Sequence, residues 1–186
     1  MKNNKNVRIG CASAFWGDTS TAAKQLVDKG DLDYLVFDFL AEVTMSILAR
    51  AKLKDSDKGF AGDFLTQIEP LLPTIKQNEI KILTNAGGIN PISCRTMLEK
   101  AAKKEGIDLN IGIVTGDDLI SELPNIEKFG ITELDTGNPF PESCLSINAY
   151  LGAPGLVAAL DKDADIVITG RCVDSALVLA PLMYEF

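Results

Sequence analysis

Short apolar segments recur along the chain, and several are followed by stretches whose apolar residues have helical spacing. After residues 34–39, for example, Val43, Ile47 and Leu48 recur as on one side of a helix. The segments with the length and composition of buried strands are 7–12, 34–39, 81–84, 110–114 and 165–169. Strands that alternate with helices form parallel sheets covered on both faces. The sequence therefore predicts an α/β fold, in one domain over 1–186, with a mostly parallel open sheet of about five strands and helices on both faces.

Capping residues indicate where several of these helices begin. Asp18 or Thr19 can cap the helix after the first strand, and Asp174 can cap the last helix. Asn90 followed by Pro91 is a stronger signal, because Asn is a favoured N-cap and Pro fits the first helical position.

Two stretches in the second half of the chain depart from this regular alternation. Residues 124–141 contain several Gly, Pro and Asn residues and are predicted to form a loop. Residues 175–186 are apolar on nearly every side, so this segment is expected to be buried. It ends without a cap or a polar tail. We therefore expect that the chain is the N-terminal part of a longer protein, the alternative being a docked C-terminal helix.

Charge and composition exclude several classes of partner. Lys and Arg number 18 and Asp and Glu number 26, which gives a net charge of −8. This balance argues against nucleic acid or an anionic membrane as the main partner, although it leaves room for a local basic site that binds a small anion. No apolar run approaches the ~18 residues of a membrane span, and the polar N-terminus lacks the apolar core of a signal peptide. A cytoplasmic protein is expected.

Cysteine and histidine usage limits the possible chemistry. The four cysteines form no C-x-x-C pair, and the chain has no histidine to complete a zinc set. Without histidine, a Ser-His-Asp or Cys-His arrangement is not possible within the chain. The cysteines are expected to be reduced, mostly buried thiols. No dinucleotide or Walker fingerprint is present, so no cofactor is identified.

Polar residues, and in one loop a pair of glycines, follow each predicted strand. They are Ser13 and Asp18; Asp38 and Glu42; Asn85, Gly87, Gly88 and Asn90; Asp117 and Asp118; and Arg171 and Asp174. Right-handed crossovers place the carboxyl ends of parallel strands at one edge of the sheet, where open sheets bind their ligands. We therefore expect these loops to meet.

Each of these groups also has a structural interpretation. Asp38 lies in a predicted apolar strand, where a carboxylate needs partners or a raised pKa. Together with Glu42, it could perform acid–base chemistry or hold a divalent metal. The structural alternative is that its carboxylate only binds nearby loop amides. Asp18, Asp117 and Asp174 could be simple helix caps. The pair at 87–88 could bind an anion through backbone amides or only form a tight turn.

Arg171 is the basic residue at a strand end. It could clamp a carboxylate or phosphate, or only pair with neighbouring acids.

Several segments at the same positions resemble the acyclic terpene utilisation family. They are residues 11–18, 33–50, 84–91, 148–153 and 165–175, and the resemblance covers nearly the whole chain in order. It implies a role in breaking down acyclic terpenes or related branched acids as CoA thioesters. Family members are longer than this chain, so the resemblance implies that part of the site lies outside it. Asn148 and Tyr150, in the fourth of these segments, join the candidate ligand-binding residues.

Two functions are compatible with these residues. The first is an enzyme or enzyme subunit of lyase, hydratase or isomerase type that acts on a branched or terpenoid acyl-CoA or acid. Asp38, Glu42 and Asp118 are its candidate catalytic residues. The candidate ligand-binding residues are Ser13, Asp18, Asn85, Gly87, Gly88, Asn90, Asn148, Tyr150, Arg171 and Asp174. The alternative is a non-catalytic ligand-binding or scaffold subunit of an acyl-CoA-processing complex. A homo-oligomer or an enzyme partner is possible with either function.

Overall fold

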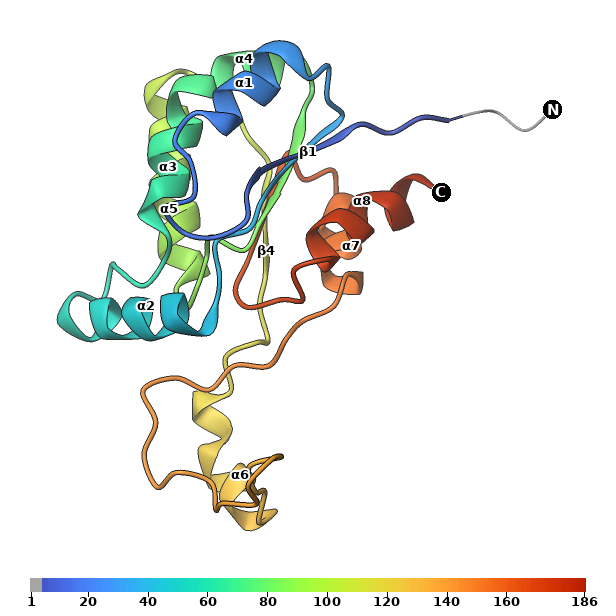
Figure 1. Cartoon of the computed structure of the whole chain (residues 1–186). Coiled ribbons are helices and arrows are strands. Elements are labelled where there is room, and N and C mark those ends of the chain that lie inside the picture. Colours follow the sequence, from blue (N-terminus) through green and yellow to red (C-terminus); the bar gives the residue numbers. More distant parts are fainter. Residues whose placement is uncertain (1–4) are drawn as a thin grey trace.

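The structure is a computed structural model that describes residues 5–186; the first part of the polar N-terminus lies outside these residues. The strands are β1 (Ile9–Ser13), β2 (Tyr34–Phe37), β3 (Lys81–Thr84), β4 (Ile111–Val114) and β5 (Ile166–Thr169). They form one parallel sheet in the order β1-β2-β3-β5-β4 (Figure 1). The predicted α/β fold is confirmed, and each of the five strands begins and ends within two residues of the expected bounds.

Helices cover both faces of this sheet. The α-helices of the described residues are α1 (Ala22–Lys29), α2 (Glu42–Lys54), α3 (Gly62–Ile68), α4 (Leu72–Gln77), α5 (Pro91–Lys104), α6 (Leu123–Lys128), α7 (Pro154–Leu160) and α8 (Ala176–Glu185). In Figure 1, α1, α3, α4 and α5 lie on one side of the sheet and α7 and α8 on the other. The helix α2 lies at the end of the sheet where the strands terminate.

Alternation along the strands explains why both faces are apolar. Leu35 and Phe37 of β2 belong to one buried cluster, which also contains residues of α1 to α5. Tyr34 and Val36, the intervening residues, belong to a second cluster with residues of α7 and α8. Successive side chains of a strand point to opposite faces, so a strand buried on both sides is apolar throughout.

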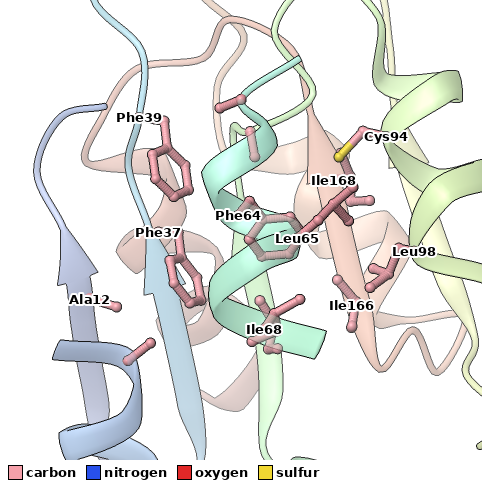
Figure 2. Close-up of a cluster of buried hydrophobic side chains, with 14 of the residues drawn as sticks. Ala12, Phe37, Phe39, Phe64, Leu65, Ile68, Cys94, Leu98, Ile166 and Ile168 are labelled. Atoms are coloured by element: carbon pink, nitrogen blue, oxygen red, sulfur yellow. The ribbon is translucent and has the colours of Figure 1, made fainter. Parts of the chain in front are cut away.

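Three phenylalanines form the centre of the larger cluster (Figure 2). Phe37 is the last residue of β2, Phe39 lies two residues beyond it and Phe64 lies on α3; all three are almost fully buried. The ring of Phe64 meets that of Phe37 edge to face, with centroids 5.3 Å apart, and that of Phe39 at 6.4 Å. This aromatic contact fixes α3 against the part of the chain that leads out of the sheet.

Helix starts agree with the sequence at α5 but not at α1 or α8. The Asn90 side chain caps α5 by accepting a hydrogen bond from the Ser93 amide, as predicted. Asp18 and Thr19 do not cap α1, which begins after Thr21; Asp18 accepts instead from the Ala14 amide within its own turn.

The predicted cap of α8 is also wrong. Asp174 does not cap this helix, which begins after Ser175, because its carboxylate pairs with Arg171. An ion pair with a largely buried guanidinium takes the place of the capping hydrogen bond.

Replacing Asn90 by alanine should lower the free energy of unfolding by about 1–2 kcal/mol. The loss combines the cap with two amide hydrogen bonds, which Asn90 donates to the carbonyls of Ser56 and Lys58 at 2.8 and 2.7 Å. Urea unfolding followed by circular dichroism measures it. Asn90→Ser keeps a capping oxygen but loses the two amide donors, so its stability should lie between those of the wild type and Asn90→Ala. An alanine variant as stable as the wild type would contradict the assignment of Asn90 as the cap of α5.

The chain between β4 and α7 extends away from the carboxyl end of the sheet (Figure 1). The expected loop at 124–141 is only partly correct, because α6 occupies its first residues, with a proline in its first turn. A short 3-10 turn, Ile120–Glu122, precedes it.

The last helix is buried on one side only. Ala176, Leu177 and Ala180 pack against the sheet, whereas Leu179 and Met183 are exposed, so within the described residues the expected burial holds only for the inner side. Among the described residues, no helix has the length and apolar character needed to cross a membrane.

Candidate functional site

Side chains from the loops after three neighbouring strands meet at the carboxyl end of the sheet. Asp38 follows β2, Asn85 follows β3 and Arg171 follows β5, and these strands are adjacent in the sheet. The fully buried Asn85 donates from Nδ2 to Asp38 Oδ1 at 2.7 Å and accepts the Phe39 amide at 2.8 Å. Asn85 therefore fixes both the carboxylate of Asp38 and the backbone that follows it.

One carboxylate oxygen of Asp38 is anchored and the other is available. Oδ1 accepts from Asn85 and, at 3.4 Å, from the Leu40 amide. Oδ2 has no hydrogen-bond partner within residues 5–186 and is not fully buried. Partial burial raises the pKa of Asp38, and the charge of Asp174 adds to the rise, while the Asn85 hydrogen bond and Arg171 oppose it. An oriented carboxyl with a raised pKa and one open oxygen is suited to proton transfer.

Arg171 is held rigidly beside this carboxylate. Its Nη1 donates to the Leu40 carbonyl at 2.9 Å and to Asp174 at 3.0 Å, and its side chain is only 9% exposed. The guanidinium also lies over the Tyr150 ring, with Cζ 4.3 Å from the centroid, in a cation–π contact. The ion pair with a neighbouring acid is present, and binding of an anionic ligand group by Arg171 stays a prediction.

Glu42 and Tyr150 form the outer rim of the site. The Tyr150 hydroxyl donates to Glu42 Oε1, and this hydrogen bond lowers the pKa of that carboxyl. Arg171 Nη2 lies 3.6 Å from the same oxygen. Glu42 is therefore expected to be ionised at neutral pH, whereas burial favours the protonated form of Asp38.

Asp117 is an important residue whose role the sequence does not reveal. It is buried, and its Oδ2 accepts from the Arg171 amide at 2.7 Å and from Asn148 Nδ2 at 3.0 Å. Burial raises the pKa of Asp117. A side chain at Gly170 would place its Cβ 2.3 Å from this carboxylate, which explains the glycine. Asp117 therefore joins the loops after β4 and β5 and is not the helix cap considered from the sequence.

The remaining candidates from β1 and β4 lie at the edges of this arrangement. Ser13 Oγ donates to the Asp38 backbone carbonyl at 3.0 Å, so it supports the loop and not the carboxylate. Asp118 accepts from the Ile120 amide at 3.0 Å and lines a separate cavity beside α2. Asp18 is held in its own exposed turn.

The loop at 85–90 has structural reasons for its glycines. The Gly88 amide donates to the Asn85 carbonyl, and the Asn90 amide donates to the Gly87 carbonyl. Gly88 also has a φ of +54°, which favours glycine. A Cβ on Gly87 would lie 2.6 Å from the Thr169 carbonyl. These contacts favour the tight-turn interpretation, and anion binding by this loop stays a prediction.

A buried hydroxyl lies next to Asn85 in the sheet. Ile168 pairs with Thr84, so the residues that follow them, Thr169 and Asn85, are neighbours on the same face. Thr169 is fully buried, and its Oγ1 has no hydrogen-bond partner within the described chain. Buried polar groups normally have a partner, so this hydroxyl adds unused hydrogen-bonding capacity close to the site.

Two other features of the molecule could mark a binding site: a group of metal-binding side chains, and a cavity at the other end of the sheet. No group of three Cys, Asp or Glu side chains in residues 5–186 is arranged to hold a metal ion. A cavity of about 400 Å³ is lined by residues that include Lys81 and Asp165, at the amino ends of β3 and β5. Ligands of open parallel sheets bind beyond the carboxyl ends, so the group around Asp38 is the candidate site.

No significant match is found among curated proteins or among solved structures. The family model described as "Acyclic terpene utilisation family protein AtuA" matches residues 7–186, which is nearly the whole chain. The matched range includes Asp38, Asn85 and Arg171, and it confirms the resemblance seen in the sequence. The chain therefore belongs to the acyclic terpene utilisation family AtuA.

Proposed function

We propose that the protein catalyses proton transfer on a branched or terpenoid acyl-CoA thioester, in a reaction of lyase, hydratase or isomerase type. The observation that carries this proposal is the geometry of Asp38. Asn85 holds one of its oxygens at 2.7 Å, the other oxygen is open, and burial raises its pKa. Membership of a terpene utilisation family supports a branched, acyclic substrate.

Proton transfer requires only groups that this site contains. The open oxygen of Asp38 accepts a proton, either from the carbon next to the thioester carbonyl or from a water molecule that attacks the substrate. The same oxygen later returns the proton to another atom of the substrate. The proton is therefore conserved in an isomerisation, and no oxidant or reductant is consumed. Asn85 keeps the carboxyl in one orientation through both steps.

The charges favour a thioester over a free acid at the reacting end. Asp38, Glu42 and Asp174 surround a single guanidinium, that of Arg171, so the group carries excess negative charge. A second carboxylate brought by the ligand would be repelled, whereas the neutral carbonyl of a thioester would not.

The pH dependence of turnover tests this proposal. Branched acyl-CoA thioesters are incubated with the protein at a series of pH values, and products are identified by mass spectrometry. Asp38 must be ionised to accept a proton, so the rate should rise with pH through the pKa of its folded state. Because burial raises that pKa, the midpoint should lie above the ~3.9 of an ordinary aspartate. Absence of turnover with every thioester at every pH would refute the proposal.

A specific observation supports a second function, that of a non-catalytic subunit. Leu179, Met183 and Phe186 give the outer side of α8 an exposed apolar surface, of the kind that often marks a protein contact. On this alternative, the thioester is bound here and processed by a partner enzyme. Turnover by the purified protein alone would exclude it, whereas thioester binding without turnover would favour it.

A further inference from the structure

A small apolar cavity lies beside the candidate site. It has a volume of about 220 Å³ and is lined chiefly by Ala49, Leu53, Ile89, Ile120 and Leu145. Two charged residues also border it. One of them, Lys52, directs its ammonium group to the Ile89 carbonyl at 2.7 Å, and the other is Asp118. Most of the wall is therefore hydrocarbon, and the cavity suits an apolar group.

Two of the segments that line this cavity also form the rim of the site. The helix α2 begins at Glu42 and supplies Ala49 and Leu53, which follow on the same side of the helix at intervals of seven and four residues. At a rise of 1.5 Å per residue, these positions lie about 10–16 Å from Glu42 along the axis.

The facing segment runs beside α2 over a similar length. Leu145 lines the cavity, and Tyr150, five residues later, contacts Glu42 and Arg171. An extended chain advances by about 3.3 Å per residue, so these five steps span at most roughly 16 Å. The helix and this segment therefore each lead from the cavity to the rim of the site, over similar distances.

We propose that the cavity binds the distal hydrocarbon of a branched acyl chain whose thioester carbonyl lies at Asp38 and Arg171. This inference rests on the proposed function and adds the chain length of the substrate. The cavity is smaller than the ~300–1,000 Å³ of pockets that enclose whole drug-sized ligands, so it fits part of an acyl chain and not the coenzyme. With carbon–carbon bonds of about 1.5 Å in a zigzag, a chain of eight carbons extends roughly 9 Å and reaches the near end of the cavity, at Ala49, whereas a chain of four carbons extends about 4 Å and does not.

Binding of two thioesters of different length tests the inference. The probes are dimethyloctanoyl-CoA, which has the acyclic monoterpenoid skeleton, and isovaleryl-CoA, which lacks the distal hydrocarbon. Leu53→Gln makes one wall of the cavity polar; Leu53 is 68% exposed, so the fold should persist. The matched control is Ile47→Gln, on the same helix, 50% exposed and outside the cavity. Calorimetry should show affinity for the long thioester falling about tenfold with Leu53→Gln and unchanged with Ile47→Gln. Affinity for the short thioester should be the same in all three proteins.

Nuclear magnetic resonance locates the bound chain directly. In protein with labelled leucine methyl groups, saturating dimethyloctanoyl-CoA should shift the signals of Leu53 and Leu145, and isovaleryl-CoA should not. Equal affinities of the two glutamine variants for the long thioester, unshifted Leu53 and Leu145 signals, or no binding by the wild type would each overturn the inference. Turnover in the same samples separates the two proposals. Binding in the cavity without turnover refutes only the proposed function, and turnover unaffected by Leu53→Gln refutes only the cavity assignment.

Discussion

Asp38→Asn is expected to reduce turnover of a branched acyl-CoA thioester by about 10²- to 10⁴-fold, the usual contribution of a positioned acid–base group. Asparagine has nearly the same shape as aspartate, and its oxygen can still accept from Asn85 Nδ2 and from the Leu40 amide. The atom that changes is the open oxygen, which becomes an amide nitrogen that cannot accept a proton. Binding of the thioester should be retained, so the loss should appear in kcat and not in KM.

Stability measurements show whether such a loss is chemical. The pKa of Asp38 is raised in the folded protein, so the folded state binds this proton more tightly than the unfolded state does. The ionised carboxylate therefore lowers stability as pH rises above the ordinary aspartate value. Asp38→Asn should be as stable as the wild type at neutral pH, or more stable, and this difference should disappear in acid, where the wild-type carboxyl is protonated.

Asp18→Asn is the matched control for this experiment. Asp18 follows a strand as Asp38 does, but its carboxylate accepts from the Ala14 amide within its own exposed turn and is not bonded to Asn85. Its variant should retain turnover within a few fold. Equal rates for wild-type protein and Asp38→Asn would remove Asp38 from the mechanism, and equal losses in both aspartate variants would indicate a general effect on folding.

The fold was predictable because its signals are local. Each strand is a short apolar run, and the helix start at Asn90 depends on residues within one turn. Asp38 was also recognisable, because a carboxylate in an apolar strand requires an explanation. The parallel topology then placed Asn85 and Arg171 beside it, since the carboxyl ends of neighbouring strands meet at one edge.

The features that the sequence did not reveal depend on contacts between distant segments. Asp117 resembles a helix cap in sequence, and only the approach of Gly170 and Asn148 shows that it joins two loops. The contact of Tyr150 with Arg171 arises where the long excursion between β4 and α7 returns to the sheet. No local pattern encodes that return path, so the cavity beside α2 could not be predicted either.

The second large effect is expected from Phe64→Ala, which should lower the free energy of unfolding by about 3–5 kcal/mol. Phe64 is fully buried on α3 and contacts the rings of both Phe37 and Phe39, so its removal leaves a cavity between that helix and the end of β2 (Figure 2). Urea unfolding followed by circular dichroism measures the change. The control is Phe129→Ala, because Phe129 is 80% exposed and its loss should change stability by no more than about 0.5 kcal/mol.

This substitution also tests whether the core supports the site. The Phe39 amide donates to Asn85, which in turn holds Asp38, so a looser Phe39 should disturb the orientation of that carboxylate. At temperatures where Phe64→Ala is fully folded, we expect kcat to fall by less than it does in Asp38→Asn, because the proton acceptor is still present. A stability loss below about 1 kcal/mol would show that the neighbouring side chains close the cavity, and then kcat should be unchanged. A large loss of stability with unchanged kcat would mean that Asn85 alone positions Asp38, independently of the aromatic cluster beneath it.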